Sequence, residues 1–501
     1  MKNIEMHFFY PYCLFFTLGK IKIMWYNLCR NENCGIITDK RTAMNSFQVR
    51  GFNPCESLLR HTPEQLTAFI RRMKELDFNS IIIHSDYGWM RYRELIEREC
   101  RNAGVEITLM VFGPRTFFSL TDWQSRWFAK DENGKPFSAV PECETHPCAA
   151  EPEAIEAFQE GAEKYIASLP CSIKRLHMRA GDGLMFCRCE KCRNIPEHEQ
   201  YQPFVAAFVR AAKKVRPDLK LETDLYIKRY AVPLDPEPYR ELDRLMFDTF
   251  YRHPFFPIGS KNDQCNRFVM QYAAPEGWAD ADTPNEFYLK RLNEWNDLFP
   301  GKLYIHENVM CQGYWGVPQY NTGVYLADLD LYRKLRLAGV CYEAYEPGFP
   351  AFEKIFTQLA QGKRSGAVPE LEKILPQSDL KVFCHDASFP FEKYLDPFYA
   401  KLARWFAKML ETGLNAAEFR ELVTFEWDNE LLLDPVLVGY AAARGGMLKG
   451  NLRFDNLSEA AQNLISRRKL WDFMEDIPPD QDPRQVCKDL IFEFVQKVRD
   501  N

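Results

Sequence analysis

Short apolar runs alternate with amphipathic segments from residue 46 to about residue 362. The runs have the length of buried strands, and the segments between them repeat apolar residues every three or four positions, as one face of a helix does. Thr62, Pro63 and Gln65 show how such a helix begins, with an N-cap, a proline at the first helical position and a capping-box partner. The predicted strands are Phe47–Gly51, Ser80–His84, Val105–Phe112, Ile173–Met178, Leu219–Tyr226, Leu245–Phe250, Lys302–His306 and Gly339–Tyr342.

Eight strands that alternate with helices predict an α/β fold of the (β/α)8 TIM-barrel class. A doubly wound open sheet is the alternative, and it usually has a glycine-rich phosphate-binding turn after its first strand. Here the first strand runs into Gly51, Phe52, Asn53 and Pro54, which form no such turn. The sequence therefore favours the barrel.

The alternation stops after Gly362, and only helical periodicity continues toward the C-terminus. We expect a barrel domain at residues 44–365, followed by a helical C-terminal domain at residues 366–501. The apolar stretch within residues 1–43 is too short and too interrupted to span a bilayer. We interpret residues 1–43 as an N-terminal extension that is not part of the fold.

Composition narrows the class of protein. The net charge of -6 argues against a nucleic-acid-binding protein, which would have a basic face. The 16 cysteines fit a reducing compartment, so we expect a cytoplasmic location. A periplasmic or secreted location would follow if the N-terminal segment were a signal peptide. The sequence leaves the oligomeric state open.

The active site of a TIM barrel lies at the C-terminal ends of its strands, so the polar and aromatic residues there are the candidates. Glycoside hydrolysis needs two carboxyl groups on either side of the scissile bond. We predict Asp182 and Glu307 as this pair, because their strands lie nearly opposite each other in an eight-strand ring, with Glu343 as a possible replacement for Asp182. The predicted substrate-binding residues are Arg50, His84, Asp86, Trp89, Arg179, Tyr226, Asp248, Tyr251, His253, Trp315 and Glu346.

Each of these residues also has a structural interpretation. A carboxylate at a strand end often caps the next helix or pairs with an arginine. Asp182 would then hold Arg179, Glu307 would hold His84 or Arg50, and the tryptophans would be core residues. Two other functions stay open, a non-catalytic carbohydrate-binding barrel and a metal-dependent barrel hydrolase or sugar isomerase.

A cysteine motif is the most specific local pattern in the chain. Cys187, Cys189 and Cys192 form CxCxxC, and Cys148 lies at the end of the long segment that follows the third strand. Four thiolates suit a tetrahedral zinc ion, and an all-thiolate site leaves no open coordination position for catalysis. We therefore predict a structural zinc and no cofactor for catalysis; reduced cysteines, with at most one bridge, are the alternative.

The run Cys148–Glu153, the triplet Gly181–Gly183 and the CxCxxC motif resemble a bacterial family of uncharacterised, glycoside-hydrolase-like TIM barrels. That family is allied to the alpha-glucuronidases and, more distantly, to the beta-N-acetylhexosaminidases. The segment Phe117–Phe137, which contains Trp127-Phe128-Ala129 and Gly134-Lys135, is similar to the segment before the first cysteine of that family. The resemblance covers roughly residues 48–410 and implies a barrel, glycan processing and a helical tail.

The resemblance also bears on the substrate, which it implies to be a uronic-acid or amino-sugar glycan. The chain lacks the Asp-Glu pair that hexosaminidases have after the fourth strand, which argues against substrate-assisted cleavage of an N-acetyl sugar. Arginine forms bidentate pairs with carboxylates. Arg50, Arg179, Arg252 and His253 therefore suggest recognition of a uronic acid.

Overall fold

The computed structural model of the chain describes most of the predicted barrel. The described residues are 47–54, 62–85, 89–142, 145–182, 185–250, 252, 257–259, 284–308 and 322–343, with Thr357, Ala360 and Glu421 as single residues. The predicted N-terminal extension lies outside the described residues, and so does the predicted C-terminal helical domain apart from Glu421. Both domain assignments stay predictions.

Strands and helices alternate along the described chain. The strands are β1 (Val49–Asn53), β2 (Ser80–His84), β3 (Glu106–Phe112), β4 (Arg175–Arg179), β5 (Lys220–Leu225), β6 (Arg244–Asp248), β7 (Leu303–Asn308) and β8 (Gly339–Glu343). The helices are α1 (Pro63–Glu75), α2 (Met90–Ala103), α3 (Gly113–Phe118), α4 (Pro152–Ser168), α5 (Gln202–Val215), α6 (Glu237–Arg240), α8 (Pro284–Leu298) and α9 (Thr322–Lys334). Short 3-10 turns lie at Ser125–Trp127, Glu197–Glu199 and Ile227–Arg229.

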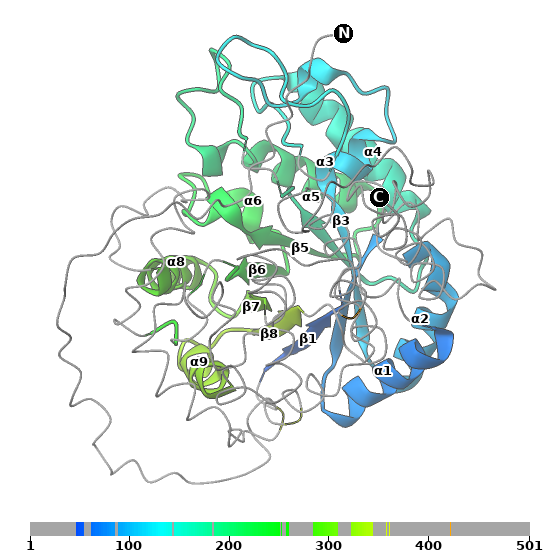
Figure 1. Cartoon of the computed structure of the whole chain (residues 1–501). Coiled ribbons are helices and arrows are strands. Elements are labelled where there is room, and N and C mark those ends of the chain that lie inside the picture. Colours follow the sequence, from blue (N-terminus) through cyan, green and yellow to red (C-terminus); the bar gives the residue numbers. More distant parts are fainter. Residues whose placement is uncertain are drawn as a thin grey trace, which may run out of the picture.

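The strands form one closed parallel barrel in the order β1 to β8. Ring closure is made by β8, which pairs in parallel with β1 over Val49↔Gly339 to Asn53↔Glu343. The helices surround the ring of strands (Figure 1). The predicted (β/α)8 barrel is therefore confirmed, and the open-sheet alternative is excluded. Among the described helices, none is both long and apolar enough to cross a membrane.

Side chains alternate between the two faces of each strand, and this alternation defines two cores. The larger core lies between the strands and the surrounding helices, and residues such as Ile81, Leu109 and Phe158 are fully buried there. A smaller apolar cluster includes Val49, Ile82, Met110, Met246, Tyr304 and Cys341. Because inward residues recur at every second position, the last inward residue of each strand reaches the mouth of the barrel.

Local signals in the sequence set the helix ends. The predicted capping box is present, since Gln65 N–H donates to Thr62 Oγ1 at 3.3 Å and Thr62 N–H donates to Gln65 Oε1 at 3.0 Å. Gly104 ends α2 with a left-handed φ of 68°, a conformation that glycine adopts without strain. The helix α3 lies in the long segment after the third strand, where the sequence predicts no helix.

The helix α3 packs closely against α4 through a glycine. Phe117 and Phe118 of α3 are buried, and both pack edge-on against Phe158 of α4. A Cβ atom at Gly161 of α4 would lie 2.0 Å from the backbone oxygen of Phe117. Glycine is thus required at this position to let the two helices approach.

The substitution Gly161→Ala should therefore destabilise the fold, although alanine is the better helix former. We expect a loss of about 1–3 kcal/mol in the free energy of unfolding, because the new methyl group meets a backbone atom that cannot rotate away. Denaturant titration would measure it, with Glu160→Ala at the neighbouring exposed position as a control that changes stability by less than about 0.5 kcal/mol. A Gly161→Ala variant as stable as the wild type would contradict this packing.

Candidate functional site

Inward side chains from four strands meet at the mouth of the barrel. Asn53, the last residue of β1, donates from Nδ2 to Glu343 Oε2 of β8 at 3.3 Å. The same Nδ2 lies 3.2 Å from Nε2 of His306 on β7 and 3.4 Å from Nε2 of His84 on β2. Residues 290 positions apart in the sequence are thus in direct contact.

A histidine between two carboxylates is the centre of this group. His306 Nδ1 lies 3.0 Å from Asp248 Oδ2, and its Nε2 lies 3.2 Å from Glu343 Oε2. The other oxygen of Asp248 accepts N–H groups from Phe250 and Asn308, each at 2.8 Å. Burial alone would lower the pKa of His306, but Asp248 and Glu343 outweigh it, so the pKa is raised above its ordinary value. A charged His306 can donate to both carboxylates at once.

The pKa of His84, the second histidine at the mouth, is shifted in the opposite direction to that of His306. Burial, followed by the positive charge of Arg179 and by His306, lowers the pKa of His84 well below its usual range. The pKa values of two histidines at the same mouth are therefore shifted in opposite directions. Groups whose environments push their pKa values apart are typical of sites that move protons.

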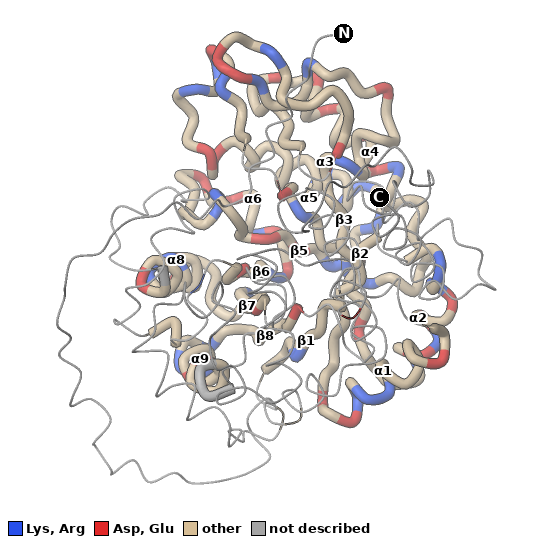
Figure 2. Tube along the Cα trace, viewed as in Figure 1, with Lys and Arg blue, Asp and Glu red and all other residues tan. Residues whose placement is uncertain are grey.

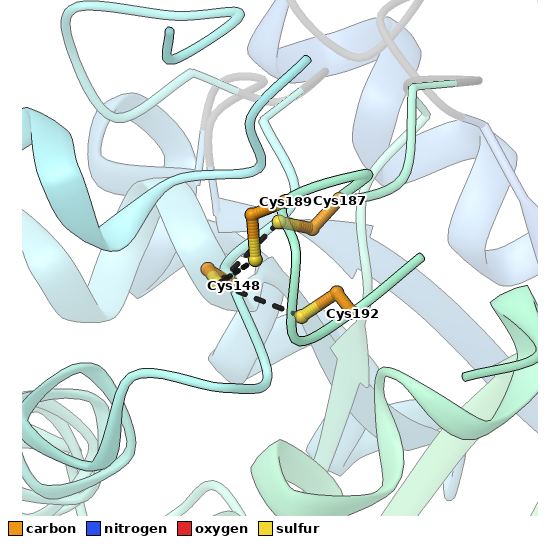
Figure 3. A group of neighbouring side chains, drawn as sticks. All are labelled: Cys148, Cys187, Cys189 and Cys192. Carbon is orange, nitrogen blue, oxygen red and sulfur yellow. Dashed lines mark hydrogen bonds between the residues drawn. The ribbon is translucent and has the colours of Figure 1, made fainter. Parts of the chain in front are cut away.

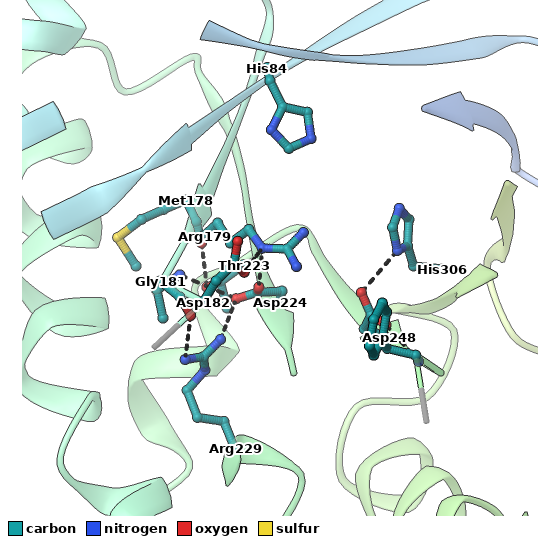
Figure 4. Close-up of polar contacts among 12 residues, drawn as sticks. His84, Met178, Arg179, Gly181, Asp182, Thr223, Asp224, Arg229, Asp248 and His306 are labelled. Atoms are coloured by element: carbon teal, nitrogen blue, oxygen red, sulfur yellow. Dashed lines mark hydrogen bonds and ion pairs between the residues drawn. The ribbon is translucent and has the colours of Figure 1, made fainter. Parts of the chain in front are cut away.

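An arginine joins the carboxylates on the β4 and β5 side of the mouth (Figure 4). Arg179 Nε lies 3.0 Å from Asp182 Oδ1 and 3.5 Å from Asp224 Oδ2, and its guanidinium carbon lies 4.4 Å from the ring centre of Tyr226. Burial opposes its charge, but Asp182 and Asp224 raise the pKa of Arg179 well above its ordinary value. Asp224 is also paired with Arg229 at 3.3 Å, so it is a structural residue that orients Arg179.

Asp182 and Glu343 stand on opposite sides of the ring, because β4 and β8 are diametrically placed in a closed barrel of eight strands. Asp182 follows β4 and its side chain is 37% exposed, whereas the side chain of Glu343 is only 7% exposed. One carboxyl group therefore faces solvent at the mouth, and the other is held within the barrel. Figure 2 shows that charged residues occur on the strands of the barrel and not only on the outer helices.

A polar layer occupies the barrel below this group. Glu222 of β5 accepts the hydroxyl of Tyr304 at 2.9 Å and pairs with Arg175 at 3.1 Å. His177 Nδ1 lies 3.5 Å from the same carboxylate. Burial would raise the pKa of Glu222, but His177 and Arg175 lower it below its ordinary value. The charged groups of this layer pair with one another, so the layer is a structural part of the barrel interior below the mouth.

The structure does not place Glu307 at the mouth, which corrects the sequence prediction. Glu307 follows His306 on β7, and successive strand residues face opposite sides. Its carboxylate accepts Arg252 Nη1 at 2.9 Å and Thr249 Oγ1 at 3.0 Å, and it contacts the hydroxyl of Tyr332 on α9. Glu307 thus belongs to a buried ion-pair network between the barrel wall and α9, on the face of β7 that points away from the candidate site.

Arg50, Trp89 and Arg252 also lie away from the mouth. Arg50 donates to the backbone oxygens of Asp77 at 2.6 Å and Phe47 at 2.7 Å, at the end of the barrel where the strands begin. Trp89 is 4% exposed and belongs to the core outside the barrel. Arg252 pairs with Glu307 and, at 2.6 Å, with Asp328 of α9. Of the arginines predicted to bind a uronic acid, only Arg179 is at the mouth.

Five of the predicted substrate-binding residues fall outside the part of the chain that the structure describes. They are Asp86, Tyr251, His253, Trp315 and Glu346. The predicted site residues did not include Asn53 or Asn308, although Asn308 follows His306 and Glu307 at the end of the seventh predicted strand. Asn53 was missed because the first strand was predicted to end at Gly51, although the alternation of the strand would have placed Asn53 on the same face as Gly51.

The four predicted zinc ligands come together. The sulfur atoms of Cys148, Cys187, Cys189 and Cys192 all lie within 4.8 Å of one another. Within the described part of the chain, they are the one group of metal-ligating residues arranged closely enough to bind an ion. The metal-dependent hydrolase or isomerase alternative therefore has no set of ligands at the mouth among the described residues.

Comparison with known proteins gives fold neighbours only. No family model matches the chain, and no curated protein matches it. Among solved structures, it is similar to a beta-galactosidase from the psychrophilic Marinomonas ef1, with 12% identity and a TM-score of 0.40 over 66% of this chain and 61% of that chain. The PgaB (BpsB) glycoside hydrolase domain from Bordetella bronchiseptica matches with 11% identity and a TM-score of 0.40 over 63% of this chain and 98% of that chain.

An alpha-galactosidase from Lactobacillus brevis matches with 12% identity and a TM-score of 0.34 over 62% of this chain and 39% of that chain. The chain thus spans about three fifths of the beta-galactosidase and two fifths of the alpha-galactosidase. At such identities and TM-scores, the similarity carries no argument about the chemistry of this chain. The relation to alpha-glucuronidases and beta-N-acetylhexosaminidases stays a prediction.

The opposite shifts of the two histidines are measurable. We expect the ring resonances of His306 to titrate above pH 6.5 and those of His84 to titrate below it, in NMR spectra of the chain labelled with ¹³C-histidine. His306→Asn and His84→Asn would assign the resonances. Because the folded pKa of His306 is raised, its stabilisation is complete below the unfolded pKa of about 6.5 and is lost as the pH rises through the folded pKa. Titration of both rings near pH 6.5 would contradict the described contacts.

Proposed function

We propose that the chain is a glycoside hydrolase whose catalytic carboxyl pair is Asp182 and Glu343. The proposal rests on one observation: two carboxyl groups lie at the same barrel mouth, next to opposite strands and in different surroundings. Glycosidases use such a pair, in which one group protonates the leaving oxygen and the other acts in its charged form on the opposite side of the sugar. The proposed substrate is therefore a carbohydrate.

Glu343 is suited to the charged role. Its Oε2 lies 3.3 Å from Asn53 Nδ2 and 3.2 Å from His306 Nε2, and Asp248 fixes the other nitrogen of the histidine. Hydrogen bonds to a carboxylate hold its oxygens in one orientation, as a nucleophile or a general base requires. Asn53, His306 and Asp248 are then positioning residues for Glu343.

Asp182 is suited to the role of the general acid if the bound substrate takes Arg179 away from it as an ion-pair partner. A general acid must carry a proton, whereas a carboxyl group in an ion pair with Arg179 is charged. A negatively charged substrate group that pairs with Arg179 would compete with Asp182 for the guanidinium and would favour the protonated form of Asp182. Asp224 and the ring of Tyr226 would keep Arg179 in place during this exchange.

This exchange favours a uronic-acid glycan as the substrate. The carboxylate of a uronic acid matches the planar guanidinium of Arg179 in charge and geometry. An amino-sugar glycan is the other substrate class that the family resemblance implies, and it offers Arg179 no such partner. We therefore propose uronides as the preferred substrates.

A non-catalytic carbohydrate-binding barrel is the second candidate function. The observation in its favour is the Asp182–Arg179 ion pair, because a permanently charged Asp182 could not donate a proton. A barrel of this kind would bind the glycan at the same mouth and release it unchanged.

Neutral variants of the two carboxyl groups test the proposed function. We expect the wild type to hydrolyse aryl uronides, and Glu343→Gln to lower kcat by about 10²–10⁴-fold. Asp182→Asn should lower kcat strongly for substrates with poor leaving groups and weakly for activated nitrophenyl substrates, which need little protonation. Steady-state rates across a panel of aryl glycosides would measure both effects.

Glu307→Gln is the matched control, because Glu307 is also a buried glutamate near a strand end. It should keep kcat near the wild-type value while lowering Tm, since it weakens the network with Arg252. A loss of turnover in this control with no loss in Glu343→Gln would overturn the assignment. Glycan binding by calorimetry without any turnover in the wild type would favour the second candidate.

Arg179→Gln tests the substrate class. We expect the ratio of kcat/KM for an aryl uronide over the matching neutral glycoside to fall at least tenfold, because the variant removes the cation that pairs with the sugar carboxylate. Arg179→Lys keeps the charge without the bidentate geometry and should fall in between. An equal loss on both substrates would show that Arg179 does not recognise a carboxylate.

A further inference from the structure

Four cysteine sulfurs lie close together where the loop that follows β4 meets the segment that precedes α4 (Figure 3). Cys187, Cys189 and Cys192 belong to this loop, and Cys148 belongs to the segment that precedes α4. The Sγ atom of Cys148 lies 3.4 Å from that of Cys187, 3.7 Å from that of Cys192 and 3.9 Å from that of Cys189. The cluster joins two segments about 40 residues apart in the sequence.

These separations fit the edges of a tetrahedron of sulfur atoms around zinc. With Zn–S bonds of about 2.3 Å, two sulfurs in a tetrahedral site lie about 3.8 Å apart. A disulfide would bring two of them to about 2.05 Å, and the cysteines of the cluster are all free. The geometry therefore fits a shared ion better than a bridge.

The backbone around the sulfurs is held in place by a buried glutamine. Gln200 is 4% exposed; its Oε1 accepts the N–H of Cys187 at 3.0 Å, and its Nε2 donates to the carbonyl oxygens of Cys187 and Ile195, both at 3.1 Å. On the other side, the N–H of Cys148 donates to Trp127 O at 2.7 Å. Both halves of the cluster are thus fixed by contacts that do not involve the sulfurs.

Donors and charges around the cluster match a thiolate site. The backbone N–H of Lys130 points at Cys187 Sγ, 3.4 Å away. Four thiolates and one Zn²⁺ have a net charge of -2, and the loop from Cys187 to Arg193 offsets it with three basic residues and one acidic residue. Thiolates select zinc over magnesium or calcium, and four protein ligands leave no open position.

We propose that Cys148, Cys187, Cys189 and Cys192 bind one structural Zn²⁺, which fastens the loop after β4 to the segment before α4. The same loop begins with Ala180, Gly181 and Asp182, so the ion also restrains the position of Asp182 at the mouth. The metal site stands independently of the proposed function, and only its effect on Asp182 rests on that function. A closed structural site of this kind contributes directly to folding.

Metal analysis of the full chain, purified under reducing conditions without chelator, tests the site. We expect about one zinc per chain, and after replacement with Co²⁺ the strong thiolate-to-cobalt absorption of a tetrahedral sulfur site. Cys192→Ser and the milder Cys189→Ser, at the partly exposed position, should bind less than a tenth of the zinc. Cys171→Ser, at an exposed free cysteine outside the cluster, should keep all of it.

A second measurement uses the wild type alone, in case the cysteine variants fail to fold. A strong chelator should remove the zinc slowly, with a fall in Tm of several degrees that added Zn²⁺ reverses. Wild-type chain that holds no stoichiometric zinc after refolding with Zn²⁺, that holds iron in its place, or that shows a disulfide within the cluster by mass spectrometry would overturn the proposal. Zinc bound at full stoichiometry with no glycosidase activity would overturn the proposed function and leave the metal site standing.

Discussion

The closure of eight parallel strands into a ring is the constraint on which the site depends. Closure pairs β8 with β1, and so brings Glu343 against Asn53 across 290 positions of sequence. The alternation of side chains then decides which residues enter the barrel. Ring closure and side-chain alternation together place Asn53, His306 and Glu343 at the mouth, although the three residues lie far apart in the sequence or on different strands.

The same constraint separates residues that look equivalent in sequence. His306 and Glu307 are neighbours on β7, yet His306 contacts Asp248 and Glu343 inside the barrel, while Glu307 pairs with Arg252 on the outside. A buried charge needs a partner to offset its lost hydration, and each network supplies one. Charge pairing is thus a condition of folding in both places, and the face of the strand decides which of the two networks lies at the mouth, where a substrate can bind.

The fold could be predicted from the sequence because its signals are local. The strand Ser80–His84 has its predicted bounds, and the cap at Thr62 forms as expected. The site could be predicted only in part. The first strand was predicted to end two residues too early, so Asn53 was left out of the predicted site. Whether the side chain of Glu307 points into the barrel or away from it depends on the strand register, which amino-acid composition does not reveal. The cysteine motif could be recognised in the sequence because three of its four cysteines lie within one short loop.

Crystallography of the Asp182→Asn variant with a bound aryl uronide would show whether the barrel mouth holds a sugar between the two proposed catalytic residues. We predict a sugar held between β4 and β8, with its carboxylate on Arg179 and its anomeric carbon between residue 182 and Glu343. The side-chain groups of those two residues should then lie about 5–9.5 Å apart, the range used by glycosidases. A sugar bound at another face, or a separation well beyond that range with no sugar between them, would contradict it.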